Sequence, residues 1–286
     1  MIIDSHCHIF TPRIVKNMQT KPGLVNALRL NVCDAWSRLH PRTLQESAET
    51  HGITACLLLP TAPPDRISLT NDRFIEYTKH FSRLRTLATL HPAMENISHE
   101  IDRILDLGIA GFKFSSFSQH FDILGEDFQR LLDRIERAAV QQNLRIILLF
   151  DTFTLGNSFF GTPLHYLTTP SRLALLVKRY PGLTFVAAHM GGLLADFHEV
   201  TKYLVPQPNL YLDTSNAAHT LQDNEFIELV RMHGPDHILF GTDWPWFIHD
   251  DEMPKIRTLL IKAGFGPSEQ AKVFGDNAKR IFGFLT

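Results

Sequence analysis

Residues 1–8 read MIIDSHCH, an apolar run that leads into two histidines, His6 and His8, with Cys7 between them. A short apolar run of this kind predicts a buried β-strand. Alternate side chains of a strand point to the same face, so we expect the two imidazoles to project together and Cys7 to point away. Neutral imidazole is a common ligand of zinc and related ions. The stretch therefore predicts the first strand of the fold and half of a metal site.

Similar apolar segments recur along the chain, and helical patterns separate them. The later predicted strands are, in order, 53–60, 85–91, 111–114, 145–151, 184–189, 209–215 and 237–243. Eight strands that alternate with helices call for a parallel sheet, and eight such units close a (β/α)₈ barrel. We therefore predict an α/β fold, a parallel eight-stranded TIM barrel, as one domain over residues 1–286.

Two regions are expected to add to the barrel. Residues 10–41 contain several prolines and predict a long, largely irregular excursion with some helix over the mouth of the first strand. Residues 256–263 and 267–282 predict two C-terminal helices. Four residues are expected to cap helices, because their side chains can accept a hydrogen bond from a free N–H at a helix start. These residues are Ser98, Asp127, Ser171 and Asp223.

Composition bounds the class of protein. The chain has 286 residues, 44% of them hydrophobic and 20% charged, with a net charge of −2, which is ordinary for a globular protein with a large core. Without a basic block we expect no nucleic-acid partner, and no apolar run approaches the roughly 20 residues that span a bilayer. Three cysteines, an odd number, and the lack of a signal peptide predict a cytoplasmic protein.

Polar side chains gather where the predicted strands end. In this barrel the chemistry lies at the carboxyl ends of the strands. The residues at or just past these ends are His6, His8, Thr61, His91, Lys113, Asp151, His189, Asp213, Ser215 and Asp243. A histidine pair, a further histidine and two aspartates at one rim form a ligand set for a divalent ion. The candidate metal ligands are His6, His8, Asp151, His189 and Asp243.

Four motifs spread over the chain resemble those of one enzyme family. They are DSHCHIF at 4–10, VAAHMGG at 186–192, ILFGTDWPW at 238–246 and VFGDNAKRIF at 273–282. Together, and in this order, they resemble the amidohydrolase superfamily in its amidohydrolase-related, or type 2, branch. The resemblance implies a TIM barrel with a metal-dependent site that acts on a small molecule.

The resemblance also implies roles for single residues. His6 and His8 match the metal-binding HxH pair, and Asp243 matches a metal ligand that also serves as base. His189 matches a histidine that polarises the substrate or assists proton transfer. The family usually has a histidine at the end of strand five, where this chain has Asp151. A carboxylate there adds negative charge, so we expect one divalent ion, zinc or alternatively the harder manganese.

Lys113 has three possible roles in such a site. It matches a lysine that is carboxylated and bridges two ions in two-metal members, but it can also bind a substrate carboxylate or pair with Asp151. Two histidines in loops, His219 and His249, are candidates for the pocket lining. Four aromatic residues are candidates either for apolar pocket walls or for core packing: Trp36, Phe153, Trp244 and Trp246.

The main function predicted from this resemblance is hydrolysis of an ester, lactone or amide. A metal-bound water is deprotonated by Asp243 and attacks a carbonyl that His189 and Lys113 polarise. Decarboxylation is an alternative, because HMGG at 189–192 resembles the HMGE of decarboxylases such as aminocarboxymuconate semialdehyde decarboxylase, without its glutamate. A metal-independent lactonase and a non-catalytic binding barrel stay open. A homodimer through barrel helices is compatible with the sequence.

Overall fold

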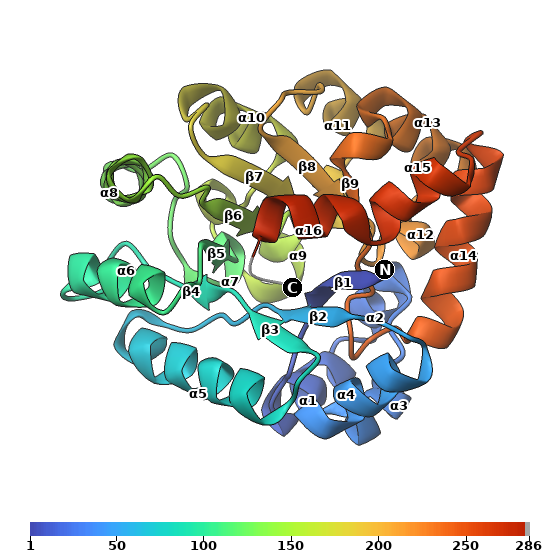
Figure 1. The fold of residues 1–286 in the computed structure, drawn as a ribbon, viewed down its shortest axis with the longest axis horizontal. Helices are drawn as coiled ribbons and strands as arrows, with labels where there is room; N and C mark the ends of the chain where they lie inside the picture. Colours follow the sequence, from blue (N-terminus) through green and yellow to red (C-terminus); the bar gives the residue numbers. More distant parts are fainter. Residues whose placement is uncertain (284–286) are drawn as a thin grey trace.

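A ring of short parallel strands forms the centre of the molecule in the computed structural model, which describes residues 1–283 (Figure 1). The strands are β1 (Ile3–Cys7), β2 (Ala55–Leu58), β3 (Leu84–Thr86), β4 (Ala88–Thr89), β5 (Gly111–Phe114), β6 (Ile147–Phe150), β7 (Thr184–Ala187), β8 (Leu210–Asp213) and β9 (Ile238–Leu239). Their order in space follows the chain, with β1 to β3 in one sheet and β4 to β9 in another.

Two seams join these sheets into a barrel. Only Leu87 separates β3 from β4, so the two segments are one interrupted strand and the ring has eight strands among the described residues. At the other seam the N–H of Ser5 donates to the carbonyl of Phe240 at 2.8 Å, and the N–H of Asp243 donates to that of His6 at 2.9 Å. The predicted TIM barrel is confirmed, although among the later strands only the fourth has its predicted length; the others, and the eighth above all, are shorter.

Amphipathic helices surround the strands (Figure 1). The longer outer helices are α4 (Pro41–Thr50), α5 (Ile67–His80), α6 (Ile97–Asp106), α8 (Glu126–Gln142), α10 (Pro170–Arg179), α11 (Phe197–Tyr203), α13 (Asp223–His233) and α14 (His249–Lys262). Each turns an apolar stripe inward; α8, for example, buries Phe128, Leu131 and Ile135 against the outer face of the strands. These stripes recur at helical spacing, which is why the sequence revealed them.

The barrel interior is packed with aliphatic side chains, not open. Ile3, Leu57 and Leu149 are fully buried there. At the amino ends of the strands the interior is closed by α16 (Asn277–Phe282), which contributes Ile281 to the same cluster. This helix follows α15 (Pro267–Ala271) and a π-helical turn (Lys272–Asp276), so the predicted C-terminal helices are confirmed. Because the interior is filled and its amino end is closed, a site in the barrel has to lie at the carboxyl ends of the strands.

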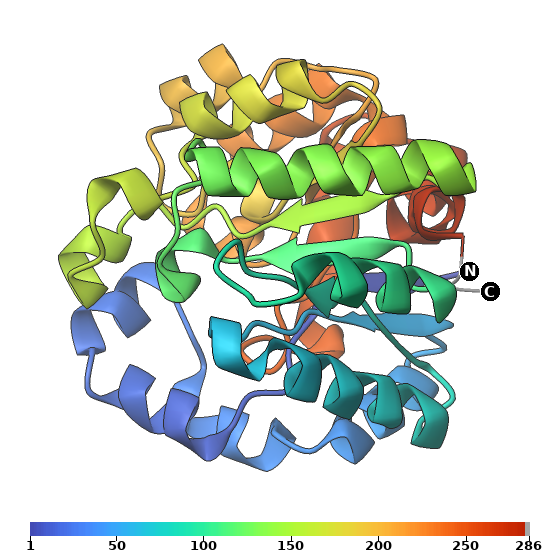
Figure 2. The same cartoon turned by 90° about the vertical axis from the view of Figure 1, so that its left-hand side faces the viewer.

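The excursion after β1 covers that opposite end. It is mostly helical, with α1 (Pro12–Gln19), α2 (Pro22–Leu28), α3 (Val32–Ala35) and a 3₁₀ turn (Trp36–Arg38), so the expectation of a largely irregular segment was wrong. Its prolines begin helices, because the first helical position needs no hydrogen bond from its N–H. Figure 2 shows these blue helices at the end of the barrel away from the two chain termini.

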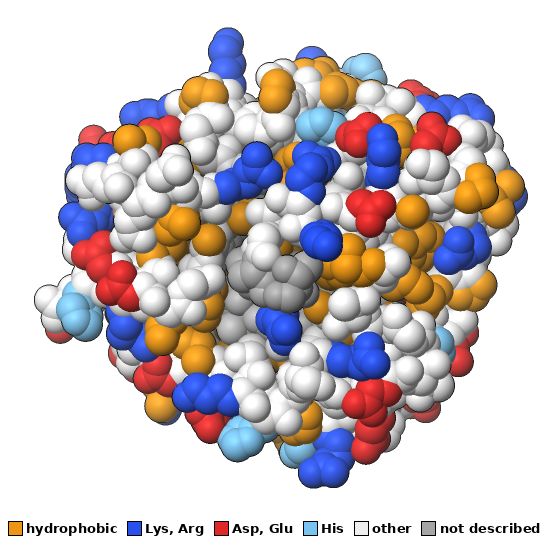
Figure 3. All heavy atoms as spheres, in the orientation of Figure 1, with side chains coloured by type: hydrophobic (Ala, Val, Ile, Leu, Met, Phe, Trp, Pro, Cys, Tyr) orange, Lys and Arg blue, Asp and Glu red, His pale blue; other side chains and the backbone are white. Residues whose placement is uncertain are grey.

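Further short elements complete the molecule. They are the helices α7 (Ser116–Gln119), α9 (Gly156–Phe160) and α12 (Ala217–Thr220), and the 3₁₀ turns Pro64–Arg66, Leu164–Tyr166, His189–Gly191 and Pro235–His237. On the face of the molecule drawn in Figure 3, positive and negative side chains are interspersed, in keeping with the net charge of −2. Within residues 1–283, no helix combines the length and the apolarity that a membrane crossing requires.

The predicted helix caps lie one or two residues from the observed ones. Thr169, not Ser171, caps α10: its hydroxyl accepts from the N–H of Arg172 while Pro170 occupies the first helical position. The other three helices begin after Asn96, Gly125 and Gln222 in place of Ser98, Asp127 and Asp223. Several candidate caps lie close together near each start, and side-chain type alone does not choose between them.

His233 in α13 makes the stability of the fold sensitive to acid. Burial lowers the pKa of this histidine to about 4, against an ordinary value of 6.5. The unfolded chain therefore takes up the proton first, so the stabilisation is complete above pH 6.5 and is lost as pH falls towards 4. The free energy of unfolding, measured with urea, is expected to fall between pH 7 and pH 4. We expect this fall to be smaller by about 2–3 kcal/mol in His233→Leu than in the native protein.

A matched variant tests the assignment. The exposed His198 serves as the control, and His198→Leu is expected to keep the acid sensitivity of the native protein. Equal losses of unfolding free energy between pH 7 and pH 4 in the native protein and His233→Leu would show that another group titrates.

Candidate active site

The two histidines of β1 converge at the carboxyl end of the strand. Their Nε2 atoms lie 3.1 Å apart, and Cys7 is buried on the other side of the strand beside Cys56, as the period of the strand predicted. A bulge accompanies this geometry, because Asp4 pairs with Cys56 but Cys7 pairs with Leu58. Three steps along β1 therefore match two along β2, and such bulges re-aim side chains near functional sites.

Asp243 completes a compact group of possible metal ligands. Its Oδ1 lies 3.4 Å from Nε2 of His8 and 3.7 Å from Nε2 of His6, and the ligand atoms all lie within 4.8 Å of one another. The backbone of Asp243 has a φ of 66°, a left-handed conformation that aspartate tolerates better than most residues. The seam between β9 and β1 thus brings together side chains from opposite ends of the chain.

Asp213 holds His6 in the form that a metal ligand needs. The Nδ1 atom of His6 lies 2.9 Å from Oδ2 of Asp213, and because an ionised carboxylate only accepts, this nitrogen carries the hydrogen. The lone pair of Nε2 is then directed towards His8 and Asp243. Burial lowers the pKa of His6 to about 4 even though Asp213 opposes the shift, so the ring is neutral at neutral pH. A carboxylate behind a histidine is the usual support of a metal-binding imidazole.

His189 is oriented from β8 in the same way. Its backbone N–H donates to Asp213 at 3.0 Å, and its Nδ1 lies 2.9 Å from the carbonyl of Ser215, which can only accept. Nε2 of His189 is therefore left facing the site, 3.7 Å from Oδ1 of Asp151. Burial by itself disfavours the charged ring, but the nearby carboxylates of Asp151 and Asp243 raise the pKa of His189 to about 9.

Lys113 is buried beside this pair. Burial lowers the pKa of its ammonium group, and the field of Asp151 opposes that shift most strongly. Its Nζ has no hydrogen-bond partner among the described residues. Although burial disfavours a charged carboxylate, Lys113 and His189 hold the pKa of Asp151 well below its usual range. Asp151 thus lies in a charged group with Lys113 and His189, and Ser115 donates to it at 3.1 Å.

Three of the five predicted metal ligands form the compact group, and two lie beside it. Asp151 and His189 line the same cavity as Asp243 but pair with each other. Metal ligation by any of the five residues stays a prediction, as do the catalytic roles of Asp243, His189 and Lys113.

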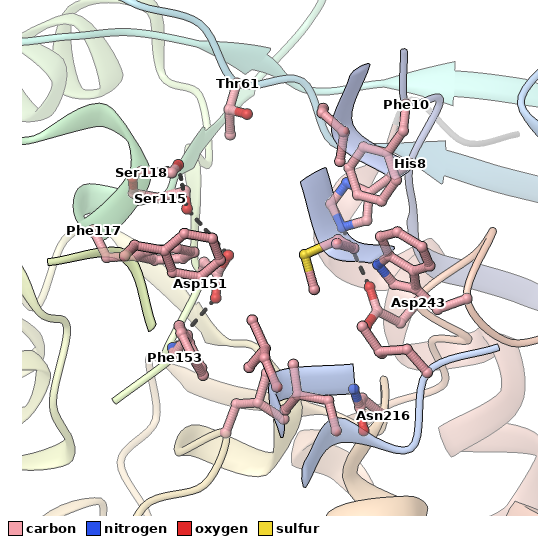
Figure 4. A pocket seen from close by; sticks show the side chains of 18 of the residues that line it. His8, Phe10, Thr61, Ser115, Phe117, Ser118, Asp151, Phe153, Asn216 and Asp243 are labelled. Carbon is pink, nitrogen blue, oxygen red and sulfur yellow. Dashed lines mark hydrogen bonds and ion pairs between the residues drawn. The ribbon is translucent and has the colours of Figure 1, made fainter. Parts of the chain in front are cut away.

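A cavity of about 430 Å³ opens above these groups. Figure 4 shows Asp151 and Ser115 on one wall and His8 and Asp243 on the facing wall, with Asn216 near Asp243. Most of the remaining lining is apolar and comes from the excursion and the loops: Phe10, Ile14, Met18, Leu24, Leu28, Leu30, Phe117, Phe153, Phe160, Leu193 and Trp246. The bottom of the cavity is therefore small and charged and its walls are apolar, a form typical of small-molecule pockets.

Several candidates from the sequence lie elsewhere. Phe153 and Trp246 line the cavity, whereas Trp244 packs in the core around Cys7 and Trp36 is 41% exposed. Three histidines have structural partners. His219 pairs with Glu252, His249 pairs with Asp4, and His91 bonds the carbonyl of Gln119. None of these three is among the residues that line the cavity.

Asp4 connects the two segments that carry the metal ligands. It accepts from the N–H of His6 at 3.1 Å, from the N–H and hydroxyl of Thr242 at 3.1 and 2.6 Å, and from Nε2 of His249 at 3.0 Å. Asp4 and His249 are fully buried. The sequence analysis did not predict this pair. An aspartate inside an apolar strand nevertheless indicates a buried partner, because a buried charge is unfavourable without one.

Other residues of the site also escaped sequence reasoning. Asn216, Ser115 and Ser118 line the cavity, and the first two are buried. Each lies just past a strand end, which was the one available signal, but serine and asparagine are common in any loop. The apolar lining from α1 and α2 could not be predicted, because that segment was expected to be irregular.

A TIM barrel with two histidines and an aspartate converging at its carboxyl end is an arrangement typical of enzymes that bind a divalent metal ion. A family model described as "Amidohydrolase" matches residues 3–284, so the chain belongs to the amidohydrolase family. The resemblance seen in the sequence is thereby confirmed. No curated protein matches the chain closely enough to count as a relative.

Solved structures of the same fold share little sequence with the chain. 5-Carboxyvanillate decarboxylase from Novosphingobium aromaticivorans, complexed with manganese and 4-hydroxy-3-methoxy-5-nitrobenzoic acid, has a TM-score of 0.69 and 17% identity, over 99% of this chain and 96% of that one. A putative 2-pyrone-4,6-dicarboxylic acid hydrolase from Pseudomonas putida has a TM-score of 0.60 and 19% identity, over 99% and 97%. An amidohydrolase from Burkholderia multivorans with bound zinc has a TM-score of 0.68 and 14% identity, over 99% and 99%.

Proposed function

We propose that the protein is a metal-dependent enzyme that removes a carboxyl group, without oxidation, from a small carboxylated aromatic compound. The observation that carries this proposal is the buried amino group of Lys113, which has no hydrogen-bond partner within residues 1–283 and lines a largely apolar cavity beside the possible metal ligands. A buried cation of this kind suits a substrate anion. The similar fold of 5-carboxyvanillate decarboxylase supports the same reaction class.

The residues present fit a divalent ion. His6, His8 and Asp243 would hold it, with two nitrogen donors and one oxygen donor within 4.8 Å of one another. Such a set suits zinc, and manganese is the alternative because the nearby carboxylates favour a harder ion. Manganese and zinc are bound in two of the similar structures. When bound, the ion supplies a Lewis acid for a carboxylate or carbonyl oxygen.

The chain's own groups would bind the ring and deliver a proton. Lys113 would contact the substrate carboxylate, and Phe117 and Phe153 would flank the aromatic ring and exclude water. His189 would donate the proton on Nε2 to the ring carbon, because its Nδ1–H is engaged by the carbonyl of Ser215. The bond between that carbon and the carboxyl carbon then breaks, carbon dioxide leaves, and His189 regains a proton from solvent.

Hydrolysis of a lactone, ester or amide is the second candidate. The position of Asp243 favours this reaction. Its Oδ1 lies 3.4 Å from Nε2 of His8, and the carboxylate could take a proton from an attacking water there. The similarity to a 2-pyrone-4,6-dicarboxylic acid hydrolase supports the same reading. The two reactions give different products, because only decarboxylation releases carbon dioxide. One panel of substrates can therefore separate them.

The test starts from metal analysis of the purified protein and uses the enzyme loaded with manganese or with zinc. The substrates are 5-carboxyvanillate, 2,6-dihydroxybenzoate, 2-pyrone-4,6-dicarboxylate and simple aryl esters. We expect release of carbon dioxide from the aromatic acids, detected by mass spectrometry, and its loss with a chelator. Ring opening without carbon dioxide would establish hydrolysis instead. Turnover that survives the chelator would indicate a metal-independent lactonase, and binding without turnover a non-catalytic barrel.

Replacement of His189 by Asn tests its role as proton donor. Asn can still donate to the carbonyl of Ser215 but cannot transfer a proton, so we expect kcat to fall by about 10²–10⁴-fold with a smaller change in KM. The control is His120→Asn, because His120 also lines the cavity, is exposed, and has a left-handed φ that Asn tolerates. A similar loss of kcat in both variants would argue against the role proposed for His189.

A further inference from the structure

Asn216 carries a carboxamide that the fold itself does not use. The side chain is fully buried, and neither Oδ1 nor Nδ2 has a hydrogen-bond partner within residues 1–283. The residue precedes α12, but its side chain does not cap that helix. Its backbone carbonyl instead accepts from the N–H of His219 at 2.9 Å. A helix cap, the usual structural role of asparagine at such a position, is thus absent.

The carboxamide belongs to the cavity of the active site. Asn216 lines that cavity and follows Ser215, which orients His189. In Figure 4 it lies on the side of Asp243, away from Ser115 and Asp151. Its backbone has a φ of 56°, which asparagine tolerates better than most other residues. A desolvated amide without partners is unfavourable, so its presence here points to a ligand that pairs with it.

The chemistry of the amide limits what that ligand group can be. A carboxamide offers N–H donors and a carbonyl acceptor. A single ligand group can pair with both its nitrogen and its oxygen only if that group both accepts and donates. A carboxylate or a methoxy oxygen only accepts, and would leave Oδ1 of Asn216 unpaired. A second anion would also lie beside the carboxylate of Asp243, which is on the same side of the cavity as Asn216. A neutral hydroxyl group satisfies each of these conditions.

We propose that Asn216 is a substrate-recognition residue that binds a hydroxyl substituent on the aromatic ring, and thereby selects hydroxylated over unsubstituted and methoxylated aromatic acids. The proposal rests on the proposed function, because it takes the ligand to be a carboxylated ring. Lys113 would bind the carboxylate and Asn216 the hydroxyl. One molecule would then satisfy the two cavity-lining residues whose buried polar atoms have no hydrogen-bond partner among residues 1–283.

The test measures binding, not turnover. Dissociation constants are determined by isothermal titration calorimetry on the manganese-loaded protein for benzoate and for its 2-, 3- and 4-hydroxy and methoxy derivatives. For at least one ring position we expect the hydroxy compound to bind about 10-fold or more tightly than both benzoate and the matching methoxy compound. In Asn216→Gly this ratio is expected to fall to about 2-fold or less, with the affinity for benzoate little changed. Glycine tolerates the left-handed backbone, so the side chain is removed without strain.

Two further variants make the result decisive. Asn216→Asp keeps the shape and the backbone conformation but can only accept, so the hydroxy compounds, which can donate to it, are expected to keep their advantage over the methoxy compounds. Asn17 lines the cavity from α1 and is exposed, and Asn17→Ala is expected to keep the native ratio. A preference that persists in Asn216→Gly would overturn this proposal alone. If no aromatic acid binds the native protein, the proposed function fails and this proposal fails with it.

Discussion

Replacing Asp243 by Asn is expected to lower kcat by about 10³-fold or more and to weaken metal binding, while the fold stays intact. Asp243 is the one carboxylate in the compact group with His6 and His8 among the described residues. Asparagine keeps its size and accepts its left-handed φ of 66°. It removes the negative charge and the ability to take up a proton at that position. The measurements are kcat, metal content by elemental analysis, and thermal unfolding.

A second aspartate shows whether the effect is local. Asp250 is 65% exposed in its side chain and pairs with His51, so Asp250→Asn is expected to leave kcat and metal content within about 2-fold of the native values. Near-normal turnover of Asp243→Asn with its metal retained would remove Asp243 from both of its proposed roles.

Replacing Asp4 by Ala is expected to destabilise the protein by about 3–5 kcal/mol. The change leaves His249, whose pKa is raised to about 10, as a buried cation without its partner, even though burial itself opposes that charge. It also removes the acceptor for the N–H groups of His6 and Thr242. Because His6 is a candidate metal ligand and Thr242 precedes another, Asp243, metal binding should weaken as well. Urea unfolding with the metal removed measures the first effect by itself.

A double-mutant cycle isolates the Asp4–His249 interaction. His249→Gln in the Asp4→Ala background is expected to cost less than His249→Gln alone, because the charge that lost its partner is removed. The comparison pair is Asp236 and Lys272 on the surface, where Asp236→Ala is expected to cost less than about 1 kcal/mol. A cost below about 1 kcal/mol for Asp4→Ala would contradict the assigned role.

Much of the architecture could be predicted because it depends on local periodicity. Apolar runs such as 145–151 mark strands, and amphipathic stretches such as α8 mark helices, whatever their partners are. The limits of these elements depend on partners. The interruption at Leu87 follows from contacts with neighbouring strands that no local pattern encodes, whereas the cap at Thr169 uses a hydrogen bond within its own turn. The excursion was misjudged because Pro12 and Pro22 start helices as readily as they break them.

The sequence by itself determined the barrel and the histidine pair, because the alternation of strands and helices and the two-residue period of β1 are local properties. Only the tertiary structure decided that Asp243 joins His6 and His8, and that Asp151 faces Lys113 and His189. It alone revealed the unpaired amide of Asn216. These features arise where distant segments meet at the barrel seam and rim, and a meeting of that kind is set by packing, not by any pattern along the chain.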